Sequence, residues 1–269
     1  MTYQVAVPSY RRAAMLRDRT LPFLLSGGVP RDRITVFVHG HDDTDSYAEV
    51  CDAAGVNLRT TSVRGINAQR AAIRSSYPDG TELVQADDDI TDVRRAVDKK
   101  TLAKIDDVDA FFRSMFATTR DAGLFSWGLS AVPNAYFMTP DRITDGLKFV
   151  IFSLFGNILR DAHPVYANTV PTKDDYEFSL RSWWYDGGII RHEGAVAKAD
   201  IYKAPGGCQD TRTVQAAEQS VQSLMEQWPG LVRRNTKRRS DFPEILLARR
   251  SRHEGNPAST PPPGVIKVD

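Results

Sequence analysis

Three consecutive carboxylates, Asp87, Asp88 and Asp89, directly follow the apolar segment 81–85. Adjacent carboxylates repel one another, so their presence at the end of a strand favours a bound divalent cation, which prefers oxygen ligands. In an extended segment successive side chains point to opposite faces. Asp87 and Asp89 can therefore share one metal ion while Asp88 faces the other side. The alternative interpretation is an acidic turn that caps the next helix.

A second acidic pair, Asp174 and Asp175, begins a helix-like segment that ends in a Trp-Trp-Tyr sequence at 183–185. The positive end of a helix dipole keeps a nearby carboxylate ionised, which suits a general base that accepts a proton from a hydroxyl group. We favour Asp175 as this base, with Asp174 second. A structural alternative is that Asp174 is an N-cap with Glu177 as its capping-box partner, and both interpretations can hold together.

Strands that alternate with helices must position these acidic residues. Apolar segments and helical periodicity predict strands at 3–7, 34–38, 56–62 and 81–85, with helices at 11–25, 45–54 and 67–76. This alternation is typical of βαβ units and a parallel sheet, in which ligands bind at the carboxyl ends of the strands. The aromatic-rich second half adds further strands. We therefore predict an α/β fold, with a Rossmann-like, mostly parallel sheet flanked by helices and an antiparallel extension.

Three segments in order resemble the donor half of GT-A glycosyltransferases: Val-Pro-Ser-Tyr at 7–10, Gly-Ile-Asn-Ala-Gln-Arg at 65–70 and Gln-Ala-Asp-Asp-Asp-Ile at 85–90. The resemblance implies that the first motif holds the nucleobase, the glycine loop and its arginine reach the diphosphate, and the acidic element holds Mn²⁺ or Mg²⁺. By motif position, the nucleotide-sugar contacts would be Pro8, Ser9, Tyr10, Arg12, Arg70, Asp87 and Asp88.

A late loop and a histidine complete the implied site. Gly206 and Gly207 lie where GT-A enzymes carry donor-covering lids, and Arg212 just after them is a candidate phosphate contact. His192 ends a predicted strand, where these enzymes often have a third metal ligand beside Asp87 and Asp89. A neutral imidazole next to two carboxylates suits Mn²⁺. The alternative for His192 is an ordinary polar residue.

The whole pattern over residues 3–215 resembles the TET-associated glycosyltransferase family, which is linked to phage modification of DNA bases and related to the base J glucosyltransferase. The resemblance implies transfer of a sugar from a UDP-sugar to the hydroxyl of 5-hydroxymethylcytosine in double-stranded DNA. Two alternatives stay open. One is a GT-A transferase acting on a glycan, protein or small molecule, and the other is a non-catalytic nucleotide- or DNA-binding module, against which the intact acidic residues argue.

A basic C-terminal segment is the second feature that suggests a polyanionic partner. Residues 231–253 contain eight Lys or Arg against two acidic residues, 8 − 2 = +6, although the chain as a whole carries a net charge of only +1. We therefore divide the chain into a catalytic domain, 1–230, and a basic arm with a Pro-rich tail, 231–269. A solvated surface is the alternative. The candidate DNA contacts are Arg233, Arg234, Lys237, Arg238 and Arg239.

Composition bounds the remaining possibilities. With 41% hydrophobic and 26% charged residues, the chain resembles an ordinary globular protein. Its longest apolar stretch, around 149–155, is far shorter than the ~20 residues that cross a bilayer, and a signal-peptide pattern is missing at the start. We expect no membrane partner and a cytoplasmic location, in the host cell if the protein is viral. Only Cys51 and Cys208 occur, so a disulfide framework is not expected. The oligomeric state stays open.

Overall fold

The computed structural model describes residues 2–40, 44–199, 213–237 and 241–255. The strands of its main sheet are β1 (Gln4–Pro8), β2 (Ile34–His39), β3 (Asn57–Thr61), β4 (Glu82–Ala86), β7 (Ser126–Leu129), β8 (Ile143–Thr144), β9 (Leu154–Ile158) and β10 (Ile190–His192). Their order is β3-β2-β1-β4-β9-β7-β10-β8. Strand β9 is antiparallel to β4 and β7, β8 is antiparallel to β10, and the other neighbours are parallel. The predicted fold class, a mostly parallel sheet with an antiparallel extension, is confirmed.

Seven α-helices are present among the described residues: α1 (Ala13–Asp18), α2 (Thr20–Ser26), α3 (Thr44–Ala54), α4 (Ile66–Ser75), α5 (Val108–Asp121), α6 (Asp174–Asp186) and α7 (Val214–Gln227). Short 3-10 turns, η1 (Arg31–Arg33), η2 (Ala135–Phe137) and η3 (Pro164–Tyr166), connect some of these elements. The single helix expected over 11–25 is divided into α1 and α2 because Arg19 leaves the helical region, with φ −125° and ψ −81°. None of the described helices has the length and apolar character needed to cross a bilayer.

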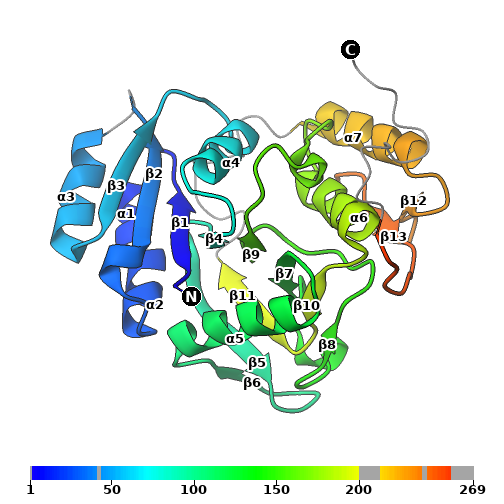
Figure 1. Ribbon diagram of the computed structural model, residues 1–269, viewed down its shortest axis with the longest axis horizontal. Coiled ribbons are helices and arrows are strands. Elements are labelled where there is room, and N and C mark those ends of the chain that lie inside the picture. Colours follow the sequence, from blue (N-terminus) through cyan, green and yellow to red (C-terminus); the bar gives the residue numbers. More distant parts are fainter. Residues whose placement is uncertain (1, 41–43, 200–212, 238–240, 256–269) are drawn as a thin grey trace.

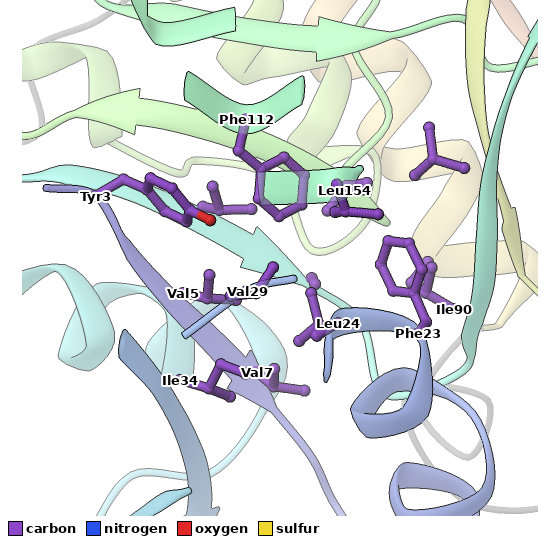
Figure 2. Packing of buried hydrophobic residues seen from close by; sticks show 14 of the residues in the cluster. Tyr3, Val5, Val7, Phe23, Leu24, Val29, Ile34, Ile90, Phe112 and Leu154 are labelled. Carbon is purple, nitrogen blue, oxygen red and sulfur yellow. The ribbon is translucent and has the colours of Figure 1, made fainter. Parts of the chain in front are cut away.

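The core forms on both faces of β1 because its side chains alternate. Val5 and Val7 belong to one buried cluster with Leu24 of α2 and Phe112 of α5, as Figure 2 shows. Ala6 points to the other face and packs with residues of α4 and β2. All of these side chains are nearly inaccessible to solvent. This two-sided burial explains why the strand is a continuous apolar sequence and ends where the polar loop begins.

Two smaller sheets accompany the main one. The first has the order β11-β5-β6, with bounds Ala195–Ala199, Ile90–Ala96 and Leu102–Lys104. The second is a hairpin of β12 (Val232–Arg234) and β13 (Ile245–Leu247), which Figure 1 shows beside α6 and α7. Val232 and Ile245 are buried with Leu180 of α6 and Trp228 after α7. This part of the segment 231–269 is therefore packed onto the body.

Candidate active site

The acidic residues form a turn at the carboxyl end of β4. The backbone N–H of Asp87 donates to the Ser153 carbonyl (2.8 Å), and the Thr20 hydroxyl donates to the Asp87 carbonyl (2.8 Å). The N–H of Ile90 in turn donates to the Thr20 hydroxyl (3.0 Å). The element that follows is strand β5, so the interpretation of this turn as the cap of a next helix is wrong. Two separate parts of the chain instead hold the turn in place.

Asp88 is the centre of a buried hydrogen-bond chain. It is 6% exposed and accepts hydrogen bonds from Ser9 Oγ (2.6 Å) and the Arg12 guanidinium (3.4 Å). The Tyr47 hydroxyl lies 2.7 Å from Ser9 Oγ and accepts from the Arg12 backbone N–H (2.9 Å). Because the one hydroxyl proton of Ser9 is directed to Asp88, Tyr47 donates to Ser9. Burial raises the pKa of Asp88 to about 6, although Ser9 and Arg12 oppose this shift.

This network fixes the loop after β1, where the sequence predicts the nucleobase site. Pro8 is buried and lies opposite Phe37 of β2 in the register, while Tyr10 stays half-buried. The next residue, Arg11, has a left-handed φ of 56° and stacks over the Tyr10 ring, 5.0 Å from its centroid. A non-glycine residue in this region is strained unless its surroundings hold it. Ser9 and Asp88 are buried in this loop, whereas Tyr10 and Arg12 are half-buried and remain available to a ligand.

Arg70 joins the two acidic segments. Its guanidinium donates to Asp87 Oδ1 (3.3 Å), to Asp174 Oδ2 (3.0 Å) and to the Phe152 carbonyl (3.2 Å). The same group lies 4.7 Å from the Phe152 ring centroid, and the residue is only 7% exposed. Helix α4 begins at Gly65 with φ 85°, a conformation that favours glycine. The turn at Gly65 sets the direction of α4, and α4 in turn positions Arg70 at the end of β4.

Asp87 is the most accessible member of the triple. Its side chain is 37% exposed, whereas Asp88 and Asp89 are buried. Partial burial raises its pKa, the Arg70 charge opposes that shift, and repulsion from Asp89, Asp88 and Asp174 adds to it. Solvent access limits the size of this effect. A cation beside Asp87 would relieve the repulsion among these carboxylates.

Helix α6 brings the second acidic pair to the site. Its N-cap is Lys173, which has a left-handed φ of 63° and provides no side-chain cap, and Asp174 is the first helical residue. The capping-box interpretation is wrong, because Glu177 instead bonds to Thr169 (2.8 and 2.9 Å) and to Arg181 (2.8 Å). Burial and the neighbouring Asp174 raise the pKa of Asp175 to about 7. Asp175 thus has the protonation range of a general base at neutral pH.

His192 is not brought together with the acidic triple. Its ring packs on Phe111 of α5, with 6.0 Å between ring centroids, and its Nδ1 accepts from the Gly194 N–H at 3.2 Å. The charges that act on it are Asp141 and Glu193, while burial lowers its pKa. Strands β9 and β7 separate β10 from β4. In the part of the chain that the structure describes, no group of three His, Cys, Asp or Glu side chains could by itself hold a metal ion.

Several predicted contacts lie outside the described residues, namely Gly206, Gly207, Arg212, Arg238 and Arg239. Strand β11 ends at Ala199 opposite Ile90, one residue from Asp89. Among the other basic candidates, Arg233 and Lys237 are exposed, and Arg234 pairs with Glu218 of α7. In the Trp-Trp-Tyr sequence at 183–185, Tyr185 is buried against His163, while the half-buried Trp183 packs on His253 and the half-buried Trp184 on Trp228.

Two supporting residues were missed by sequence reasoning. Thr20 holds the acidic turn, and Tyr47 connects α3 to the loop after β1. Both have less than 1% of their surface exposed. A buried threonine and tyrosine on amphipathic helices look like ordinary core residues in a sequence. Only their partners, 67 and 38 residues away, distinguish them.

Comparison with solved structures identifies the fold. A mannosyltransferase from Pyrobaculum calidifontis, solved with GDP-Man and Mn²⁺, is 13% identical, with 82% of this chain and 63% of that chain covered and a TM-score of 0.50. TarS from S. aureus (12%, 84% and 66%, TM-score 0.48) and glucosyl-3-phosphoglycerate synthase from Mycobacterium tuberculosis with Mn²⁺, UDP and phosphoglyceric acid (11%, 92% and 86%, TM-score 0.48) are also similar. This chain has a GT-A-like fold. It spans less than two thirds of the length of the first two proteins.

No protein-family model matches the sequence, and no curated protein matches it either. The relationship is therefore one of fold. What this chain binds and transfers has to be inferred from its own site.

Proposed function

We propose that this chain is a metal-dependent glycosyltransferase that takes a sugar from a nucleotide-sugar, specifically a UDP-sugar. The observation that carries the proposal is the Arg70 bridge. One guanidinium contacts Asp87 at the end of β4 and Asp174 at the start of α6, at 3.3 and 3.0 Å. A donor-side carboxylate and a base-side helix therefore face one common space, as transfer from a leaving diphosphate to a hydroxyl requires.

The acidic turn suits a cation that arrives with a diphosphate. Mg²⁺ is commonly bound by one or two carboxylates together with substrate phosphates and water. Asp87 and Asp89 would supply the two carboxylates. When bound, Mn²⁺ or Mg²⁺ would offset the negative charge that develops on the departing diphosphate. Neither His192 nor a third carboxylate is needed for this role.

The chain's own residues provide the other functions. Ser9, Arg12 and Asp88 fix the loop whose half-buried Tyr10 would contact the nucleobase. Arg70 holds Asp174 and leaves Asp175, the next residue, to accept the proton of the attacking hydroxyl. A pKa of about 7 lets Asp175 be ionised before the reaction and hold the proton after it.

For the acceptor we propose 5-hydroxymethylcytosine in double-stranded DNA. The motif resemblance supports this choice, and so does the excess of basic residues in the segment 231–253, which contains the β12–β13 hairpin. Glycans, proteins and small molecules are the competing acceptors. Release of UDP from UDP-sugars with Mn²⁺, with and without each acceptor, tests the proposal. We expect slow release that is stimulated by hydroxymethylated DNA but not by plain DNA or oligosaccharide, and mass spectrometry of the nucleosides would identify the sugar. If no UDP-sugar binds, the proposed donor class is wrong.

The basic hairpin gives a separate prediction for DNA. Replacing Arg233, Arg234, Lys237, Arg238 and Arg239 with Ala should weaken DNA binding and reduce its salt dependence, because each lost phosphate contact removes counterion release. Donor hydrolysis should be unchanged. Titrations at several salt concentrations measure both slopes, with Lys99→Ala and Lys100→Ala, in the exposed turn between β5 and β6, as the control. Equal slopes for wild type and the hairpin variant would exclude DNA contact there and direct the search to glycans or proteins.

A further inference from the structure

One face of α4 carries a second arginine beside the site. Asn67, Arg70 and Arg74 are three and four residues apart, so they lie on the same side of the helix. Together with Phe152, Tyr166 and Phe178 they line a cavity that also reaches Asp174. The proposed function assigns Arg70 and Asp174 but gives Arg74 no role.

Arg74 is a surplus cation in this cavity. Its guanidinium stacks over the Tyr166 ring at 4.7 Å from the centroid. Stacking uses the flat face of the group and leaves the N–H donors at its edge. In the described part of the chain no carboxylate lies within salt-bridge distance of Arg74, and Asp174, the acidic residue of the cavity, is ion-paired with Arg70. Burial lowers the pKa of Arg74 to about 10; the Arg70 charge adds to this shift, and Tyr166 and Asp174 oppose it.

Arg74 is half-buried, and in the part of the chain that the structure describes its charge is not balanced by an ion pair, so the edge of its guanidinium that faces the cavity can bind an anion. The two arginines and Asp174 leave the cavity wall with a net charge of +1. The cavity volume is about 30 Å³, roughly the space of two water-sized groups. Such a space accepts a carboxylate or the outer oxygens of a phosphate, but not a whole sugar or base.

We propose that Arg74, with Asn67 beside it, forms a subsite for a small anionic group on one of the substrates. The group is either a carboxylate on the donor sugar or a carboxylate or phosphate on the acceptor. This subsite proposal rests on the proposed glycosyl transfer, because it adds a charge requirement to the same site. The enzyme would then prefer a substrate that carries a negative group near the transferred bond.

Binding of inorganic phosphate at constant ionic strength tests the subsite directly. We expect saturable binding to wild type that Arg74→Gln weakens by about tenfold or more, because a charge-assisted hydrogen bond is lost. Arg59→Gln is the matched control: Arg59 also stacks on a tyrosine, Tyr77, but is exposed and outside the cavity. Arg74→Lys keeps the charge and should bind phosphate more tightly than Arg74→Gln. This comparison separates the loss of charge from a folding defect in the Gln variant.

Two further titrations identify the source of the anion. If Arg74→Gln weakens UDP-glucuronate but not UDP-glucose, the donor carries the group. If phosphate still binds wild type with UDP-glucuronate already in place, the acceptor carries it. No saturable phosphate binding to wild type, or equal binding to wild type and Arg74→Gln, would overturn the proposal. Failure of UDP itself to bind would instead refute the glycosyl-transfer function, while the phosphate result would stand.

Discussion

Asp87→Asn and Asp89→Asn are each expected to reduce sugar transfer by about a thousandfold or more. The substitution keeps the size of the side chain but removes the charge that would hold a divalent cation against the leaving diphosphate. The fold should persist, because the backbone of the turn is held by Ser153 and Thr20, not by these carboxylates. Removal of one repelling charge from the cluster should leave the free energy of unfolding unchanged or slightly higher.

UDP release with increasing Mn²⁺ measures this effect, and thermal unfolding checks the fold. Asp98→Asn is the control, since Asp98 caps an exposed turn through the Lys100 and Thr101 N–H groups and lies away from the site. If either variant keeps more than about a tenth of wild-type activity, the loss of transition-state stabilisation is below ~1.4 kcal/mol. That result would rule out a role for the substituted carboxylate in metal-assisted departure of UDP.

Asp175→Asn should lower the transfer rate by roughly 10²–10⁴-fold, the usual contribution of a positioned general base. Affinity for the UDP-sugar should hardly change, because Asp175 is not one of the Arg70 partners. Asp174→Asn gives the comparison: it breaks the Arg70 contact and should mainly alter donor binding. If Asp174→Asn reduces the rate as much and leaves donor binding intact, the base is Asp174. Equal loss of donor affinity in Asp175→Asn would make Asp175 structural.

The same residue predicts two pH effects of opposite sign. The proposed base must be ionised for transfer, and the pKa of Asp175 is about 7. The wild-type rate should therefore fall as the pH drops below this value. Folding responds the other way. The folded pKa of about 7 exceeds the ordinary value of 3.8, so the folded protein binds the proton more tightly than the unfolded chain. The destabilisation from Asp175 therefore develops as the pH rises from 3.8 to about 7, and Asp175→Asn should reduce the difference in unfolding free energy between pH 5 and pH 8.

The donor half could be predicted from the sequence because its strands and helices alternate at short range. Strands β1, β2 and β4 are buried, mainly apolar segments with polar residues at their ends, which places Asp87 and the loop after β1 at one edge of the sheet. Arg70 follows Gly65 within one helix, so its motif could also be recognised. These features depend on local patterns, which a single sequence contains.

Long-range pairing could not be predicted in the same way. Strand β9 lies between β4 and β7 in the sheet, so the distance from His192 to the acidic turn depends on a strand order that chain order does not reveal. Strand β5 pairs with the nearby β6 and also with β11, about a hundred residues later, and the second of these pairings could not be foreseen from local sequence. At the start of α6, the N-cap is Lys173 in a left-handed conformation, not Asp174 as the capping-box interpretation expected.

The way the C-terminal residues close over α6 sets an order of events during synthesis. Trp183 donates to the Ser251 carbonyl, 68 residues later, and the His253 N–H donates to the Gly187 carbonyl at the end of the helix. Contacts between sequence-distant residues form late, and a nascent chain folds from its N-terminal part first. The β1–β4 half can therefore assemble while the ribosome is still adding residues. The helix that carries Asp174 and Asp175 gains its final contacts only when residue 253 has left the exit tunnel, so the emerging protein holds a formed β1–β4 half before the helix with the proposed base is fixed in place.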